Sequence, residues 1–175
     1  MEYNATPTAT KFHQDDAFVR ALMGPIGSGK SVACCTEIMR RACEQLPWEN
    51  GVRKSRWAVI RNTYRELIDT TMETFFDWFP RDLGLWRQMD MKWTFVQALP
   101  DGTTVHLEVL FRALDRPNDI KKLLSLELTG GWLNEAREIP KAILDMLQGR
   151  VGIHDNAKPA WSTFTLRRVT TNPAL

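Results

Sequence analysis

The sequence has few cysteines, and all of them fall in one short stretch. Cys34, Cys35 and Cys43 are the three cysteines among 175 residues. An odd number gathered on one predicted helix makes neither a disulfide framework nor a zinc-binding pattern, which excludes small disulfide-linked folds and zinc modules. We expect these thiols to be small core residues in a reducing compartment.

Long apolar runs and a strong charge of one sign are missing as well. No stretch approaches the roughly 18 consecutive apolar residues of a membrane-spanning helix, and the N-terminus lacks the apolar core of a secretory signal. Lys and Arg total 23 against 21 Asp and Glu, and this net charge of +2 does not by itself argue for nucleic acid. We therefore expect a soluble, intracellular protein without membrane contact.

Basic residues do gather locally, and each group is interpreted either as a solvated face or as a DNA contact. Because most such groups on proteins are solvated, none of them assigns a DNA site alone. The groups are Arg53 with Lys54 and Arg56, Arg61 with Arg65, Lys121 with Lys122, and Arg167 with Arg168.

The length favours a single domain. With 175 residues, of which 43% are hydrophobic, the chain is long enough for one well-buried core and short for two. Residues 1–10 are polar and rich in Thr and Pro, so we assign 1–11 to an N-terminal arm, which is either mobile or an interaction tail. Residues 12–175 are expected to form the domain.

The stretch Gly24–Ser31 has the spacing G-x-x-x-x-G-K-[ST] of a phosphate-binding loop. Glycines allow turns in which successive N–H groups converge on phosphate oxygens. Lys30 is expected to lie between the β and γ phosphates of ATP, and Ser31 to offer its hydroxyl to Mg²⁺. The alternative is a glycine-rich turn that merely joins a strand to a helix. The predicted nucleotide-binding residues of the loop are Gly24, Gly27, Ser28, Gly29, Lys30 and Ser31.

Strand and helix patterns alternate around this loop, which favours an α/β sheet. Residues 18–23 form an apolar run typical of a strand, and 32–46 have apolar positions at helical spacing that include Leu46. A buried parallel strand is predicted at 57–60 and a helix over 68–79. Further predicted elements are a hairpin of 93–99 with 103–111, a short helix within 114–126, a helix over 140–148 and a strand over 164–170.

The segment Leu128–Glu135 is an apolar strand that ends in polar groups, the pattern of a Walker B segment. A carboxylate at this position orients the water that attacks the γ phosphate, and we assign Glu135 that role. The preceding position usually holds an aspartate that steadies Mg²⁺, but here it is Asn134. Its amide oxygen can still accept a hydrogen bond from a metal-bound water, although it brings no negative charge. The alternative is a strand that runs into a helix cap without catalysis.

Two further positions near predicted strand ends are candidates for ligand contact. Gln14 precedes the first strand, where it either contacts adenine or belongs to an ordinary surface turn. Arg61, Asn62 and Arg65 follow the second strand at the sheet edge where ligands bind in open α/β folds. They contact DNA or nucleotide, or they cap the helix.

With these segments in place, residues 12–173 resemble the ATPase domain of the large terminase subunit, the DNA-packaging motor of tailed bacteriophages. The resemblance implies an α/β P-loop NTPase fold of the ASCE or RecA-like type, with a mainly parallel sheet and an added antiparallel hairpin. It rests on the ordered motifs F-H-x-D-x-x-x-x-R, G-x-x-G-S-G-K-S, W-A-V-I-R-N-T-Y-R-E-L, G-W-L-N-E-A-R-E-I-P followed by L-x-G-R-V-G, and T-T-N-P.

The resemblance also implies site residues and partners. Thr171 and Asn172 match the coupling motif that senses the γ phosphate, and Asn134 with Glu135 matches the end of Walker B. Expected partners are double-stranded viral DNA, the portal protein and a small terminase subunit, with the ATPase assembled as a homo-oligomeric ring, a pentamer. The expected location is the host cytoplasm, with transient docking on the procapsid. The nuclease domain of the family has no counterpart in these residues.

This sequence departs from the family pattern inside the loop, where many members carry an arginine and this chain has Ile26. An arginine finger from a neighbouring subunit could supply the missing cation at the γ phosphate. The first candidates are Arg112 and Arg116 and the second are Lys121 and Lys122, each with a plain surface charge as the alternative.

Two other functions remain open from the sequence. One is a generic or helicase-like P-loop ATPase, which shares the catalytic core. The other is a nucleotide-binding structural module in which Asn134 has impaired hydrolysis.

Overall fold

The structure is a computed structural model, which describes residues 2–114, 119, 121, 123, 125–151 and, for the backbone, 161–167. The elements are α1 (Pro7–Gln14), β1 (Val19–Gly24), α2 (Lys30–Glu44), β2 (Val52–Arg61), α3 (Tyr64–Glu66), the π-helix η1 (Leu67–Met72), α4 (Glu73–Trp78), the 3-10 helix η2 (Arg81–Leu83), β3 (Leu85–Arg87), β4 (Lys92–Ala98), β5 (Thr104–Ala113), β6 (Gly130–Leu133), the 3-10 helix η3 (Ala136–Glu138), α6 (Lys141–Gln148) and β7 (Trp161–Arg167).

One sheet organises the domain, with the strand order β1-β7-β6-β2-β5-β4-β3. In this order, the five strands from β1 to β5 (β1, β7, β6, β2 and β5) are parallel to one another. Strands β4 and β3 continue the sheet in antiparallel pairing. The placement of β7 between β1 and β6 is the order of the RecA-like class, so the predicted fold class and the predicted hairpin are both confirmed.

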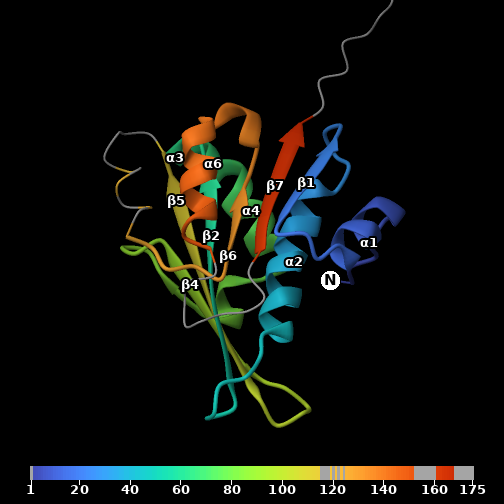
Figure 1. The fold of residues 1–175 in the computed structure, drawn as a ribbon, viewed down its shortest axis with the longest axis vertical. Helices are drawn as coiled ribbons and strands as arrows, with labels where there is room; N and C mark the ends of the chain where they lie inside the picture. The colour runs from blue at the N-terminus through green and yellow to red at the C-terminus, as the bar shows by residue number, and fades with distance from the viewer. Residues whose placement is uncertain are drawn as a thin grey trace, which may run out of the picture.

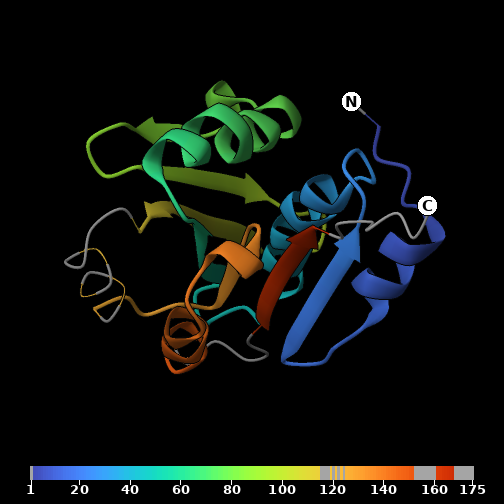
Figure 2. The same ribbon diagram turned by 90° about the horizontal axis from the view of Figure 1, so that it is seen from above.

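Helices cover both faces of this sheet, with α2 and α4 on one face and α6 on the other (Figures 1 and 2). The side chains of β2 alternate between the two layers because successive strand residues point to opposite faces. Trp57 and Val59 belong to the core beneath α2 and α4, whereas Ala58 and Ile60 belong to the core beneath α6. All four are fully buried, as predicted for a parallel strand covered on both sides.

A glycine allows the α6 layer to approach the sheet closely. A Cβ built at Gly131 of β6 would lie 2.7 Å from Leu147 Cδ2 of α6, which is closer than real contacts permit. The second glycine of the Gly130-Gly131 pair is therefore accounted for by the packing of Leu147 against the sheet.

The boundaries of several elements differ from those predicted. Helix α2 spans Lys30–Glu44 rather than 32–46, so Leu46 lies beyond it and is 69% exposed instead of in the core. The last strand begins at Trp161 rather than at residue 164. The helix predicted within 114–126 falls largely outside the described residues. Among the described residues, no helix is both long and apolar enough to cross a bilayer.

The N-terminal residues are more ordered than an arm. Residues 7–11 are helical as part of α1, and Ala9 and Phe12 on that helix are buried. Tyr3 OH lies 2.8 Å from His13 Nε2.

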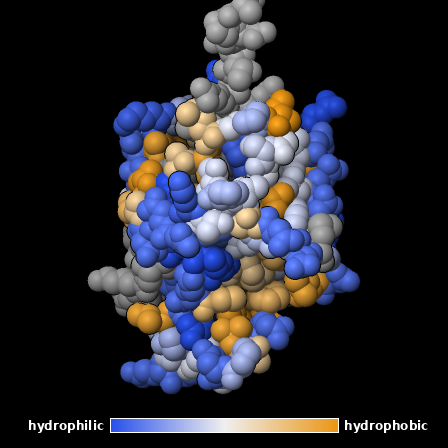
Figure 3. Space-filling model, turned by 90° about the vertical axis from the view of Figure 1, so that its right-hand side faces the viewer, coloured by the Kyte–Doolittle hydropathy of each residue, from blue (hydrophilic) through white to orange (hydrophobic). Residues whose placement is uncertain are grey.

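Figure 3 shows the side of the molecule that carries α1 and α2, which is mostly hydrophilic with small separate groups of apolar side chains.

A buried carboxylate on α2 joins α1, β1 and α2. Glu37 has no exposed surface, and its Oε1 accepts hydrogen bonds from Arg20 of β1 at 2.6 Å and from Arg41 at 2.7 Å. Its Oε2 accepts from Arg40 at 2.9 Å and lies 2.6 Å from Nδ1 of His13 on α1. This set of five residues, the Glu37 cluster, fixes the three elements relative to one another.

The cluster also holds the backbone that leads into β1. Arg20 Nη1 donates to the carbonyl of Asp15 at 3.0 Å, and Arg41 Nη2 donates to the same carbonyl at 2.9 Å. Burial alone raises the pKa of Glu37, but hydrogen bonds from its basic neighbours and the charge of Arg20 outweigh it and hold the pKa well below its usual 4.5.

Glu37→Gln is expected to lower the free energy of unfolding near neutral pH by about 3 kcal/mol, because it leaves buried cations uncompensated. Since the folded pKa of Glu37 lies below the unfolded value near 4.5, this stabilisation is present above pH 4.5 and is lost as the pH falls further. Urea unfolding of parent and variant across this range should show the gap narrowing in acid. Glu44→Gln, at an exposed partner of Arg40, is the matched control, with a loss below about 1 kcal/mol. A gap that does not change with pH would contradict the assignment.

Candidate functional site

The predicted phosphate-binding loop joins the carboxyl end of β1 to the first turn of α2. Gly27 and Gly29 have positive φ angles of 75° and 77°, which residues with side chains rarely adopt. Nothing lies within 4 Å of a Cβ built at either position, so glycine is required there by backbone conformation rather than by space. At Gly24 a Cβ would lie 3.0 Å from Ser28 Oγ, so the loop is also closely packed at its start.

The side chain of Lys30 folds back over this loop. Its Nζ donates to the carbonyls of Gly24 at 3.0 Å and Pro25 at 2.8 Å. Ser28 Oγ donates to the same Pro25 carbonyl at 2.8 Å. The ammonium group is thereby held against the backbone that would surround a phosphate.

The N-terminus of α2 faces the same loop. The cap residue is Gly29, which provides no side-chain acceptor for the N–H groups of the first turn. Such groups, together with the positive end of the helix dipole, favour a bound anion. Ser31 is half-buried in this first turn.

The end of β6 carries the second predicted part of the site. Asn134 N donates to Ile60 O at 2.9 Å, which extends the pairing with β2 one residue past Leu133. The Asn134 side chain is buried, and its Nδ2 donates to Thr71 Oγ1 at 2.8 Å. Glu135 has left-handed backbone angles, φ 54° and ψ 53°, which are uncommon for a residue with a side chain and concentrate at functional sites.

The two parts lie at one edge of the sheet, separated by a single strand. Gly24 of β1 pairs with Arg167 of β7, and Leu133 of β6 pairs with Phe164 of β7. Neighbouring strands are ~4.8 Å apart, so β1 and β6 are roughly 10 Å apart. Because both strands are parallel, their carboxyl ends meet at the edge where open α/β sheets bind ligands.

Arg61 supports the turn that follows β6. Its Nη1 donates to Asn134 O at 3.3 Å and lies 3.1 Å from Glu138 Oε2, while Nη2 lies 3.5 Å from Glu66 Oε1. Arg61 is only 7% exposed, so its charge serves this turn rather than a surface contact. The cap of α3 is Thr63, whose Oγ1 accepts from Glu66 N at 3.3 Å.

The oxygen-bearing side chains at this edge fit a Mg²⁺ ion that is bound together with a nucleotide. In the part of the chain that the structure describes, no three His, Cys, Asp or Glu side chains are grouped to hold a metal. Mg²⁺ bound with a nucleotide needs no such group, because it keeps several waters and takes phosphate oxygens. The Ser31 hydroxyl and the Asn134 amide are suited to that limited role.

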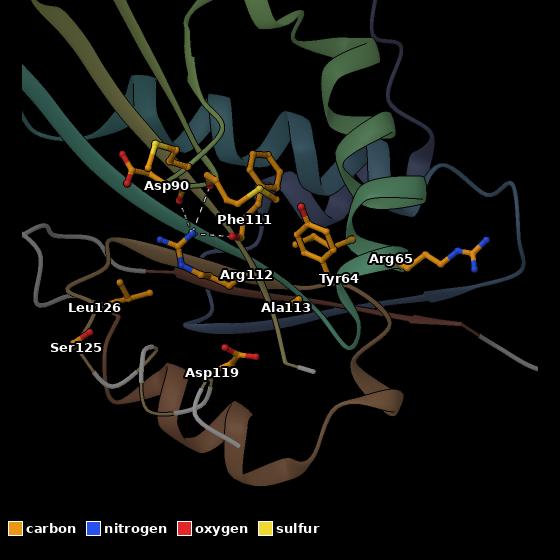
Figure 4. A pocket seen from close by; sticks show the side chains of 12 residues that line it. Tyr64, Arg65, Asp90, Phe111, Arg112, Ala113, Asp119, Ser125 and Leu126 are labelled. Carbon is orange, nitrogen blue, oxygen red and sulfur yellow. Dashed lines mark hydrogen bonds between the residues drawn. The ribbon is translucent and has the colours of Figure 1, made fainter. Parts of the chain in front are cut away.

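Arg112 lines a pocket of about 920 Å³ between the carboxyl end of β5 and the start of α3, away from the phosphate-binding loop (Figure 4). Its Nη1 donates to the carbonyls of Phe111 at 2.8 Å, Asp90 at 3.0 Å and Met91 at 3.5 Å. Burial lowers the pKa of Arg112, which is half-buried. Tyr64 and Leu67 belong to the same lining.

The other predicted site residues are less informative. Arg116, Lys122, Thr171 and Asn172 lie outside the described residues. Lys121 is exposed, and so is Gln14, the adenine candidate, which is the last residue of α1.

Two of the basic residues Arg53, Lys54 and Arg56 on β2 form ion pairs with the hairpin of β4 and β5. Arg53 Nη2 lies 2.7 Å from Asp101 Oδ2, and Arg56 Nε lies 2.6 Å from Glu108 Oε2. The third member, Lys54, lies 4.6 Å from the ring centre of Trp48. These contacts favour the interpretation of the group as a structural face.

Two contributors to the site were not found from sequence. Glu37 had one detectable signal, because Arg40 and Arg41 follow it at the spacing of ion pairs on a helix. Thr71 had none, because its position depends on a π-helical turn.

At the level of sequence, neither a protein-family model nor a curated protein matches this chain. Solved structures do match its fold. The Thermus phage P74-26 large terminase ATPase domain superposes with a TM-score of 0.64 and 19% identity, over 94% of this chain and 65% of that one. The large terminase of a second, thermophilic bacteriophage gives a TM-score of 0.64 at 13% identity, over 88% and 34%. That second terminase in complex with ADP gives 0.62 at 12% identity, over 89% and 34%.

These comparisons concern the fold, because identity is low throughout. The chain spans about a third of the length of the second phage's terminase and 65% of the P74-26 ATPase domain. The resemblance to large terminases is therefore confirmed in three dimensions: this chain has the fold of a large terminase ATPase domain.

Proposed function

We propose that this chain is the ATP-hydrolysing motor domain of a viral terminase, which moves double-stranded DNA into a procapsid. The observation that carries the proposal is the meeting, at one sheet edge, of a glycine-shaped phosphate loop and a carboxylate on a left-handed turn. The fold shared with large terminase ATPase domains, one of them bound to ADP, supports it.

In this proposal each site residue has a separate role in hydrolysis. Lys30 neutralises charge on the β and γ phosphates, and Glu135 orients the water that attacks the γ phosphorus as the bond to ADP breaks. Ser31 and Asn134 are the residues that would hold Mg²⁺ at this edge, Ser31 through its hydroxyl and Asn134 through its amide, and the ion would supply positive charge at the phosphate oxygens. Gln14 is kept as the adenine contact, and Thr171 with Asn172 as the sensor of the γ phosphate.

The wider assembly follows from the same proposal. The partners are double-stranded viral DNA, the portal protein, a small terminase subunit and further copies of the chain in a pentameric ring. The site of action is the procapsid in the host cytoplasm. The large terminase identity of the structural neighbours supports this assignment.

The position of Arg112 favours a role in another subunit over a role in its own. Three strands separate β5 from β1, so Arg112 lies about 19 Å across the sheet from its own loop. As a finger for a neighbouring loop, it would have to release its bonds to the carbonyls of Asp90, Met91 and Phe111. Arg116 is the alternative finger.

The two alternative functions make different predictions. A helicase-like ATPase would separate DNA strands as a purified protein. A structural module would bind ATP without turnover even when portal and DNA are added. The terminase proposal requires turnover that moves duplex DNA without separating it.

Lys30→Ala and Glu135→Gln should separate ATP binding from hydrolysis. Glu135→Gln is expected to bind ATP and to lose at least about 100-fold in turnover, because it cannot act as a base. Lys30→Ala should lose both, because the loop no longer compensates the phosphates. Phosphate release and binding of a fluorescent ATP analogue measure the two effects. Lys141→Ala, at an exposed lysine paired with Asp145, is the control and should match the parent.

Asn134→Asp should raise the ATPase rate at limiting Mg²⁺, because a carboxylate adds the negative charge that the amide lacks. The measurement is turnover against Mg²⁺ concentration for parent and variant. Equal rates at the lowest Mg²⁺ concentrations would show that position 134 does not influence the metal.

Mixed subunits test the proposed finger. Chains with Arg112→Ala, or with Arg116→Ala, are mixed with hydrolysis-dead Glu135→Ala chains, and ATPase activity should be restored, because each partner supplies what the other lacks. Arg65→Ala, whose side chain is 91% exposed in the same pocket, is the control and should remain active alone. If ATPase activity were restored with neither the Arg112→Ala nor the Arg116→Ala chains, the sharing of these arginines between subunits would be contradicted.

A further inference from the structure

The Asn134 side chain is held by a residue far from it in sequence. Its Nδ2 donates to Thr71 Oγ1 at 2.8 Å, and both side chains are buried, with Thr71 only 1% exposed. Thr71 belongs to η1, which packs beside β2 and β5. It therefore lies outside the loops that form the proposed nucleotide site. The bond therefore joins the end of β6 to a helical layer on the face covered by α2 and α4.

The helix that presents Thr71 has an unusual form. Residues 67–72 are π-helical between the α-helical turns α3 and α4. A π-turn is rare and is found mostly as a single turn inside an α-helix, frequently at functional sites. Leu67, Thr71 and Met72 are its buried residues, so the π-turn places one hydroxyl among apolar side chains that face the sheet.

The chemistry at Asn134 depends on which end of its amide faces the metal. An amide has a donor end, NH₂, and an acceptor end, the carbonyl oxygen. Waters bound to Mg²⁺ present their hydrogens outward, so only the oxygen end can accept from them. Aspartate has no such requirement, because both of its ends are oxygens.

We propose that Thr71 is a positioning residue of the nucleotide site: by accepting the hydrogen bond from Asn134 Nδ2, it directs the amide oxygen toward the water shell of Mg²⁺. This inference rests on the proposed function and extends it to a residue outside the phosphate loop and Walker B segment. It also explains how an asparagine serves at a position where aspartate is usual. The π-turn brings the Thr71 hydroxyl to Asn134.

A hydrogen bond that only satisfied a buried amide would affect folding and not the metal. The discriminating quantity is therefore the Mg²⁺ preference, defined as the affinity for a fluorescent ATP analogue in Mg²⁺ divided by its affinity in EDTA. Loss of stability alone changes both affinities alike.

Thr71→Val keeps the volume of the side chain and removes the hydroxyl. We expect the Mg²⁺ preference to fall about ten-fold, the usual effect of losing a group that orients a metal ligand. Thr71→Ser, which keeps the hydroxyl, should stay within about two-fold of the parent. If Thr71→Val does not fold, Thr71→Ala, which adds no bulk, replaces it.

The neighbouring threonine provides a matched control. Thr70 is exposed, and its Oγ1 donates to Glu66 O at 2.6 Å within the same helix. Thr70→Val removes a hydroxyl that lies 3.5 Å from Thr71 Oγ1, but it leaves the 2.8 Å hydrogen bond from Asn134 Nδ2 to Thr71 Oγ1 in place. Its Mg²⁺ preference should equal that of the parent.

The Asn134→Asp background gives a second, independent test. Because the new side chain has an oxygen at each end, Thr71→Val in that background should change the Mg²⁺ preference by less than about two-fold. An equal loss in both backgrounds, or no loss in Thr71→Val alone, would overturn the inference while leaving ATP binding intact. A parent chain that bound no ATP in either condition would overturn the proposed function and this inference with it.

Discussion

The Glu37 cluster is the interaction on which the arrangement around the predicted phosphate-binding loop depends. The phosphate-binding loop leaves β1 and enters α2, and Glu37 binds a cation on each, Arg20 and Arg41. A loop whose two ends are fixed loses less conformational freedom when it surrounds an anion, and this preorganisation favours binding. Through His13 the same carboxylate also fixes α1. Buried charges are costly unless each is paired, so the cluster specifies one arrangement of the three elements.

Beyond that cluster, the site is assembled from strand ends rather than from one segment. The loop follows β1, Glu135 follows β6, and Arg61 at the end of β2 supports the turn that follows β6. The left-handed backbone at Glu135 is a strained conformation that the surrounding contacts maintain. Asn134, one residue earlier, still belongs to the ladder through its N–H to Ile60. Asn134 is thus the last residue of the ladder, and Glu135 begins the turn that follows it.

Features encoded locally could be predicted, and features that depend on distant partners could not. The loop and the strand around Trp57 were found because glycine spacing and a continuous apolar run are properties of a few neighbouring residues. The packing of α1 against the domain was not predicted. The segment has the polar composition of an arm, and it is held in place by a buried contact between His13 and Glu37. The Thr71–Asn134 bond joins residues that are distant in sequence and depends on a π-turn that periodicity does not reveal.

The insertion of β7 between β1 and β6 has a consequence for the order of assembly. Among the described strands, β1 pairs with β7 alone, and β7 is the last of them in the chain. During synthesis from the N-terminus, the strand that carries the phosphate-binding loop therefore cannot join the sheet until residues 161–167 have emerged. Pairing between such distant segments is also intrinsically slow. The predicted phosphate-binding loop and Glu135 are therefore placed at one edge of the sheet only after β7 has paired with both β1 and β6.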